Sequence, residues 1–141
     1  MDIRHITPDY AVSPQITAED AQAIADAGFK LVICNRPDAE VTPDLAEETI
    51  RAAVEAAGLR FEALPLTQET MTLDNAARHR ALMESAEGPV LAYCRTGTRC
   101  SVVWALGHAS ILSPDDILSK TSAAGYQLDQ LRPTLTQIAG Q

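Results

Sequence analysis

Short apolar runs alternate with amphipathic segments along the chain. Three continuous apolar runs have the length of buried strands, at residues 30–34, 60–66 and 89–93, and residues 3–6 and 10–13 suggest an N-terminal hairpin. Continuous apolar strands are typical of parallel sheets that are covered on both faces. The alternation of strand and helix therefore predicts an α/β fold, with a parallel-dominated central sheet flanked by helices on both faces.

Capping residues mark the boundaries of the predicted helices. Helix starts are predicted at Thr17, at the 42–44 segment Thr-Pro-Asp and at the 113–116 segment Ser-Pro-Asp-Asp. The corresponding helix ends are predicted at Gly28, Gly58 and Gly125. A final amphipathic segment follows, with Leu128, Leu131, Leu135 and Ile138 on its apolar side.

Length and composition narrow the class of protein. With 141 residues, 46% of them apolar, the chain is expected to form one domain over residues 1–141. A net charge of -8 argues against a nucleic-acid partner. No apolar run has the length of a membrane span and the N-terminus lacks the pattern of a secretory signal, so we expect a cytoplasmic protein with no membrane partner. The oligomeric state stays open.

The cysteines and histidines do not have the spacing of a disulfide scaffold or a zinc site. We therefore expect free thiols, no metal and no cofactor. Cys34 lies inside an apolar run and is interpreted as a buried core residue. His79, between two arginines, is interpreted as a solvated helix residue, and His108 as helix surface or a satisfied interior histidine.

The candidate catalytic residues lie where a helix follows the predicted strand 89–93. In parallel sheets, ligands bind beyond the carboxyl ends of the strands, and residues 35–37, 67–74 and the segment from Cys94 onward meet that edge. Unpaired N–H groups at a helix start favour a thiolate at Cys94, and nearby Arg99 and Arg95 add positive charge. The planar fork of Arg99 can bind two oxygens of a tetrahedral anion. The predicted anion-binding loop consists of Arg95, Thr96, Gly97 and Thr98. In the alternative interpretation, Cys94 only ends a strand and Gly97 only turns the chain.

At these residues the chain resembles the cysteine-dependent protein phosphatases and the rhodanese-type sulfurtransferases. Over nearly its full length it looks like the bacterial family called beta-lactamase-hydrolase-like protein, phosphatase-like domain; the resemblance lies in the hairpin and in residues 27–33, 35–37, 57–61 and 94–99. This resemblance implies a tyrosine-phosphatase-like fold. The family is variously labelled phosphatase and sulfurtransferase, and its members occur alone or fused to metallo-β-lactamase-type hydrolases.

The sequence departs from the phosphatase signature, which has five residues between cysteine and arginine. Here four residues separate Cys94 from Arg99, and Tyr93 stands where phosphatases usually have histidine. The shorter spacing is the length associated with rhodanese-type sulfur transfer. Cys100, directly after Arg99, has a further possible role, as a disulfide partner of Cys94 under oxidation.

A phosphatase also needs an acid for its leaving group, and Glu69 and Asp74 are the candidates. Glu69 is equally well a solvated loop charge, and Asp74 a first-turn helix charge. Arg36 either adds charge at the same edge or anchors the turn before Pro37.

Three functions follow from these residues. The first is a cysteine-dependent phosphatase that acts on a phosphate monoester through a cysteinyl-phosphate on Cys94. The alternative, of nearly equal weight, is a sulfurtransferase that carries a persulfide on Cys94 and takes its sulfur from a sulfane-sulfur donor. The third is an inactive module that binds an anion for regulation. All three imply a small anionic ligand.

Overall fold

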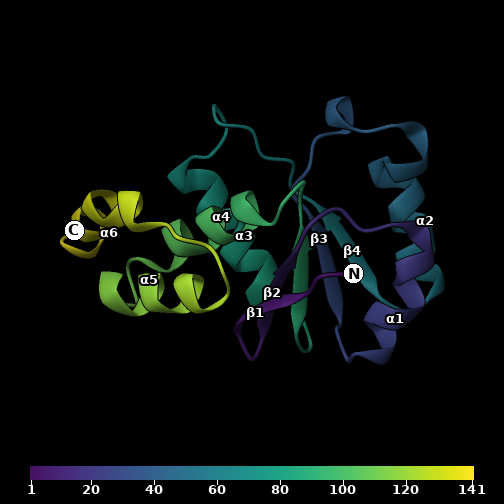
Figure 1. The fold of residues 1–141 in the computed structure, drawn as a ribbon, viewed down its shortest axis with the longest axis horizontal. Coiled ribbons are helices and arrows are strands. Elements are labelled where there is room, and N and C mark those ends of the chain that lie inside the picture. The colour runs from purple at the N-terminus through teal and green to yellow at the C-terminus, as the bar shows by residue number, and fades with distance from the viewer.

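Five strands form one sheet in the order β1-β2-β5-β3-β4 in the computed structural model, which describes residues 1–141 (Figure 1). The strands are β1 (Arg4–Thr7), β2 (Tyr10–Ser13), β3 (Leu31–Cys34), β4 (Arg60–Ala63) and β5 (Val90–Tyr93). β1 pairs with β2 in antiparallel orientation, and all other pairings are parallel. The predicted N-terminal hairpin and parallel-dominated sheet are confirmed.

The middle of the sheet is occupied by β5. Its last residue, Tyr93, lies opposite Ser13 of β2 on one side and Cys34 of β3 on the other. β2, β3 and β5 are buried along their whole length, as expected for inner strands covered on both faces. Because the parallel strands end in register, the segments that follow them meet at one edge, and the segment after β5 lies at its centre.

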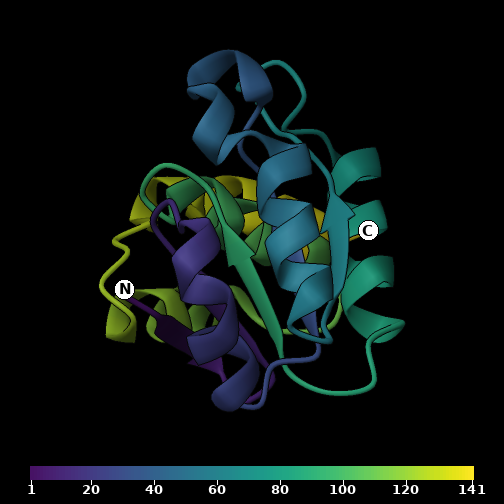
Figure 2. The ribbon, with the colours of Figure 1, turned by 90° about the vertical axis from the view of Figure 1, so that its right-hand side faces the viewer.

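Helices cover both faces of the sheet, as predicted. α1 (Ala21–Asp26) and α2 (Glu47–Ala56) lie over one face, which Figure 2 views from their side. α3 (Leu73–Glu84) and α4 (Thr98–His108) cover the other face, and α5 (Pro114–Ala123) and α6 (Arg132–Ala139) pack beyond α4 (Figure 1). No helix is both long enough and apolar enough to cross a bilayer.

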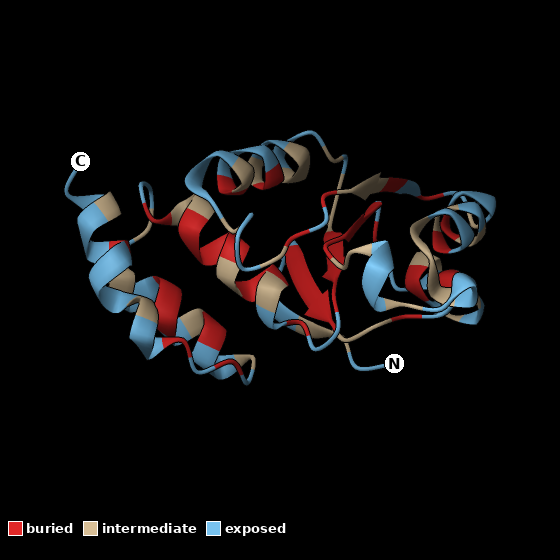
Figure 3. Ribbon diagram, turned by 90° about the horizontal axis from the view of Figure 1, so that it is seen from above, coloured by how far each residue is buried: buried red, intermediate tan, exposed pale blue.

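Alternate strand residues supply the two halves of the core. Val32 and Leu91 point toward α1 and α2, whereas Ile33 and Ala92 point toward α3 and α4, where Trp104 is fully buried. Figure 3 shows the buried residues concentrated in the inner strands and on the helix faces that meet them. The continuous apolar runs in the sequence arise from this covering on both sides.

The second helix starts later than its capping residues predict. Residues Pro43–Leu45 form a single 3-10 turn, and the extended backbone at Ala46 separates it from α2. The N–H of Glu47 donates to Asp38 Oδ1 at 2.8 Å, so a carboxylate from an earlier turn satisfies the start of α2.

β4 is also shorter than predicted. It ends at Ala63, ahead of Pro65. Beyond it the N–H groups of Leu64 and Leu66 donate to the carbonyls of Cys34, at the end of β3, and Asn35. Pro65 has no N–H and cannot continue a ladder.

The interpretation of His79 as a solvated residue is wrong. His79 lies on the inner face of α3 and has no exposed surface. Its Nε2 lies 3.3 Å from Asn35 Oδ1, and its ring meets Tyr10 edge-on. Burial lowers the pKa of His79 to about 3, with a smaller contribution from His108, so the ring is neutral. The flanking arginines indicated the exposed side of the helix, but not which residue faced the sheet.

Candidate active site

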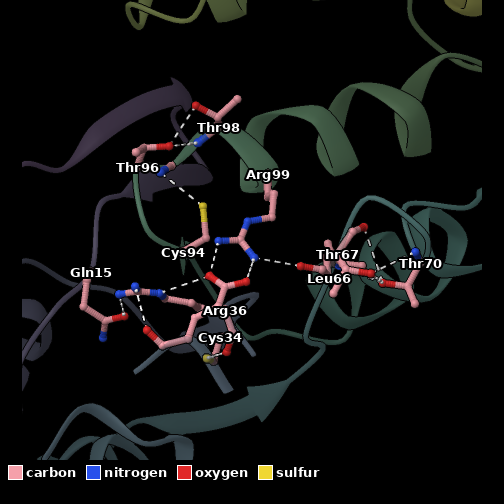
Figure 4. Close-up of polar contacts among 12 residues, drawn as sticks. Gln15, Cys34, Arg36, Leu66, Thr67, Thr70, Cys94, Thr96, Thr98 and Arg99 are labelled. Carbon is pink, nitrogen blue, oxygen red and sulfur yellow. Dashed lines mark hydrogen bonds and ion pairs between the residues drawn. The ribbon is translucent and has the colours of Figure 1, made fainter. Parts of the chain in front are cut away.

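Cys94 is held at the centre of the sheet edge. It follows β5 directly, and its N–H donates to the Ser13 carbonyl at 3.3 Å. Gly97 adopts the left-handed conformation, with φ of 90°, just before α4 begins at Thr98. This turn directs the Gly97 N–H onto Cys94 Sγ at 3.1 Å (Figure 4). The loop therefore places a backbone donor on the sulfur just before a helix start.

The environment strongly favours the thiolate of Cys94. The hydrogen bond from the Cys100 thiol and the N–H groups of Cys100, Thr96 and Gly97 lower the pKa of Cys94 to about 5, even though burial acts in the opposite direction. Burial is also the main cause that raises the pKa of Cys100, which therefore stays protonated and can donate. The predicted thiolate thus depends mainly on Cys100 and the loop amides, and the arginine charge that the sequence also suggests is not among the main causes.

Arg99 lies in the first turn of α4 and is bound by a carboxylate that the sequence analysis missed. Its Nη2 and Nη1 donate to Glu40 Oε1 and Oε2 at 2.7 and 2.9 Å, and Nη1 also donates to the Leu66 carbonyl at 2.8 Å. The Glu40 hydrogen bond is the main cause that raises the pKa of Arg99, to which the charge of Cys94 also contributes. The same bond holds the pKa of Glu40 below its usual range.

Arg36 also binds Glu40, and its hydrogen bonds go to Glu40 and Gln15 rather than to the loop. Its Nε lies 3.3 Å from Glu40 Oε1, its Nη2 donates to the Glu40 carbonyl at 3.1 Å, and its Nη1 donates to Gln15 Oε1 at 3.1 Å. Arg36 thus binds Glu40, and Glu40 in turn binds Arg99. The spacing of four residues between Arg36 and Glu40, after a strand that ends at the site, was the signal available in the sequence.

The other candidate residues lie at the rim of the site. Arg95, Thr96 and Thr98 are exposed, and the hydroxyls of the two threonines share a 2.9 Å hydrogen bond (Figure 4). Glu69 and Asp74 are exposed, and their side chains form no hydrogen bond or ion pair. Neither carboxylate is therefore fixed by a hydrogen bond to the Cys94 loop.

The remaining cysteine is part of the core, as the sequence indicated. Cys34 is buried, its Sγ donates to the Arg36 carbonyl at 3.3 Å, and burial raises the pKa of its thiol. No group of three or more potential ligands gathers to hold a metal ion.

Cys94 itself has no exposed surface, and no residue of the 94–99 loop lines a surface pocket. Contact between the sulfur and a substrate therefore requires a local rearrangement at the site.

Comparison with known proteins shows which family the chain resembles. Residues 2–111 match the family described as Beta-lactamase hydrolase-like protein, phosphatase-like domain. The chain belongs to this family. A beta-lactamase hydrolase-like protein of Agrobacterium fabrum is 32% identical over 98 residues, which cover 70% of this chain and 23% of that protein. The phosphatase-like domain therefore spans less than a quarter of the length of this relative.

Solved structures share the fold of the phosphatase-like domain. A candidate phosphatase from Neisseria meningitidis is 38% identical, with a TM-score of 0.85 over 98% of this chain and 99% of that one. TpbA from P. aeruginosa, in a complex described with pTyr, is 18% identical, with a TM-score of 0.64 over 96% of this chain and 90% of that one. The tyrosine-phosphatase-like fold implied by the sequence is confirmed.

Proposed function

We propose that this phosphatase-like domain hydrolyses phosphate monoesters, with Cys94 as the nucleophile. The observation that carries the proposal is the buried Cys94 sulfur, which accepts the Gly97 N–H at 3.1 Å and has a pKa of about 5. A thiolate that is stable at neutral pH is an activated nucleophile, and the backbone amides beside it can also bind an oxyanion.

The reaction takes two steps. The thiolate forms a bond to phosphorus while the ester P–O bond breaks, and the leaving oxygen takes the bonding electron pair. Water then attacks the cysteinyl-phosphate, which releases phosphate and restores the thiolate. The loop amides and Arg99 stabilise the charge on the equatorial oxygens of the transferred group in both steps.

Arg99 retains the donors that this role needs. Glu40 and Leu66 engage both Nη1 hydrogens and one Nη2 hydrogen, so the Nε hydrogen and the second Nη2 hydrogen remain. These two hydrogens lie on the same side of the guanidinium group and form a fork that matches two oxygens of a tetrahedral anion. Arg99 can therefore bind Glu40 and the substrate at the same time.

The leaving group identifies the best class of substrate. Glu69 and Asp74 are the candidate acids by sequence, but in this structure both are exposed and neither side chain is hydrogen-bonded to the Cys94 loop, so we favour esters that leave without much help from an acid. Phenols, with a pKa of about 10, are better leaving groups than alkyl alcohols. Aryl phosphates are therefore the proposed substrates, in line with the pTyr described in the TpbA complex.

A second candidate function, sulfur transfer, is favoured by the four-residue spacing between Cys94 and Arg99. In this reaction the Cys94 thiolate would attack the outer sulfur of a sulfane-sulfur donor, whose bond to that sulfur breaks as the rest of the donor leaves with the electron pair. An acceptor thiolate would then attack the outer sulfur of the persulfide and release the Cys94 thiolate. A persulfide presents a single sulfur in place of three phosphoryl oxygens, so a smaller loop suffices.

One set of assays separates the functions. We expect hydrolysis of an aryl phosphate, protection of Cys94 from alkylation by vanadate or phosphate, and loss of hydrolysis in Arg99→Lys, which lacks the fork. If neither anion protects the thiol, no aryl phosphate is hydrolysed, and thiosulfate or glutathione persulfide loads sulfur that cyanide releases, the sulfurtransferase replaces the phosphatase. If the protein binds the anion but catalyses neither aryl-phosphate hydrolysis nor sulfur transfer, it is the regulatory module.

A further inference from the structure

One peptide unit of the loop is held at both ends. The N–H of Gly97 donates to Cys94 Sγ at 3.1 Å, and the carbonyl of the same peptide, which belongs to Thr96, accepts the Tyr126 hydroxyl at 3.0 Å. In a trans peptide the N–H and the C=O point in opposite directions. The Tyr126 bond on the outer side therefore keeps the N–H pointing inward, toward the sulfur.

The opposite orientation of this peptide would be unfavourable for a thiolate. If the 96–97 peptide turned over, the carbonyl oxygen would face Cys94 Sγ, and the sulfur would exchange a hydrogen-bond donor for a partial negative charge. Gly97 permits such rotations more readily than any other residue, because it has no Cβ. A hydrogen bond to the Thr96 carbonyl therefore stabilises the orientation that favours the thiolate.

Tyr126 is itself well fixed. It is 8% exposed, its N–H donates to the Thr121 carbonyl, and the Arg4 guanidinium lies 5.5 Å from its ring centroid. The hydroxyl lies so close to Gly97 that a Cβ at that position would overlap it. Tyr126 follows α5 and lies outside the 2–111 segment that matches the family, so that match assigns it no role.

We propose that Tyr126 is a positioning residue for the Cys94 loop. Its hydroxyl holds the 96–97 peptide with the N–H directed at the sulfur, which stabilises the thiolate and keeps the same N–H available to an oxyanion. This role rests on the proposed function of Cys94 as a thiolate nucleophile. It ties the C-terminal helices, through one hydroxyl, to the chemistry at the centre of the sheet edge.

Tyr10 offers a matched control in the same chain. Its hydroxyl is also buried and donates to a backbone carbonyl, that of Cys100, at 2.8 Å. The N–H of that peptide belongs to Ser101 and donates to the Gly97 carbonyl inside the helix start, away from the sulfur. Tyr10→Phe and Tyr126→Phe therefore each remove one buried hydroxyl bond, but only the second removes a bond to the peptide whose N–H lies on Cys94 Sγ.

The test measures the rate of Cys94 alkylation by iodoacetamide against pH in the wild type and both variants, with the melting temperature as a check on folding. Alkylation is followed at Cys94 by mass spectrometry. In Tyr126→Phe we expect the Cys94 pKa to rise by about one unit, which slows alkylation at about pH 4 roughly tenfold. We also expect phosphate to protect the thiol about fivefold less well. Tyr10→Phe, whose hydroxyl bonds to Cys100 and not to the 96–97 peptide, is expected to change both values less than Tyr126→Phe does.

An unchanged Cys94 pKa and unchanged protection in folded Tyr126→Phe would overturn the inference, as would equal shifts in both variants. The proposed function is tested separately, by turnover in the wild type. If the wild type hydrolyses no aryl phosphate but Tyr126→Phe still raises the Cys94 pKa, the function fails and the positioning role stands.

Discussion

Glu40 binds both terminal nitrogens of Arg99, through Oε1 at 2.7 Å and Oε2 at 2.9 Å, although the two residues are 59 positions apart in the sequence. The pair forms where the segment after β3 meets the first turn of α4. It orients the guanidinium end-on toward Glu40 and leaves the side-on fork for an anion. Arg36, bound to the same carboxylate, completes a chain of contacts that reaches Gln15.

The first prediction concerns this pair. Glu40→Gln removes the charge and one acceptor oxygen, so we expect Arg99 to lose its orientation and vanadate to protect Cys94 from alkylation roughly five- to tenfold less well. The Cys94 pKa should change little, because Cys100 and the loop amides are its main determinants. The control is Glu62→Gln, because Glu62 also pairs with an arginine, Arg60, but on β4 and at the surface. Stronger protection in Glu40→Gln would show that Glu40 competes with the anion for Arg99.

The second prediction distinguishes the cysteines. Cys94→Ser should lower aryl-phosphate turnover by roughly 10³-fold or more, because a serine hydroxyl is not ionised at neutral pH. Cys34→Ser, at a buried thiol that donates to the Arg36 carbonyl, should keep most of the turnover. Initial rates of the purified variants decide the matter, and substantial turnover in Cys94→Ser would refute the proposed nucleophile.

The third prediction concerns the Cys100 thiol. Because this thiol donates to the Cys94 thiolate, its removal in Cys100→Ala should move the Cys94 pKa upward from about 5, whereas Cys100→Ser keeps a donor and should largely preserve it. The inflection of the iodoacetamide alkylation rate against pH, followed at Cys94 by mass spectrometry, reports this pKa. A wild-type inflection near the model-peptide value of about 8.5 would contradict the thiolate itself.

The fourth prediction links buried His79 to acid stability. The folded protein holds His79 neutral with a pKa of about 3, whereas the unfolded chain takes up the proton near the ordinary value of about 6.5. The stabilisation is therefore complete above about pH 6.5 and is lost as the pH falls toward 3. This residue alone should cost the wild type about 2 kcal/mol between pH 7 and pH 5.

Urea unfolding of the wild type, His79→Gln and His5→Gln across this pH range tests the prediction. His79→Gln should be less stable at pH 7 but show a flatter pH dependence, whereas His5→Gln, exposed on β1, should keep the wild-type slope. Equal slopes in all three proteins would assign the acid sensitivity to other groups.

The sequence by itself determined the class of the fold and the centre of the site. Apolar runs such as 30–34 and 89–93 have no polar face, so they belong between two layers of helices, and the alternation with helices makes their pairing parallel. The Cys94 loop was equally accessible, because the strand, the turning glycine and the helix start are adjacent in the chain. Local chemistry alone places amide donors around that sulfur.

Tertiary structure decided the partners of the site residues. Glu40 meets Arg99 because β3 lies beside β5 in the sheet, and the Tyr126 hydroxyl reaches Thr96 because the chain after α5 returns to the sheet edge. His79 is buried because its face of α3 lies against the sheet. Hydrophobic patterns report which residues avoid water, but strand order and helix docking determine which polar groups meet, since those contacts join segments distant in sequence.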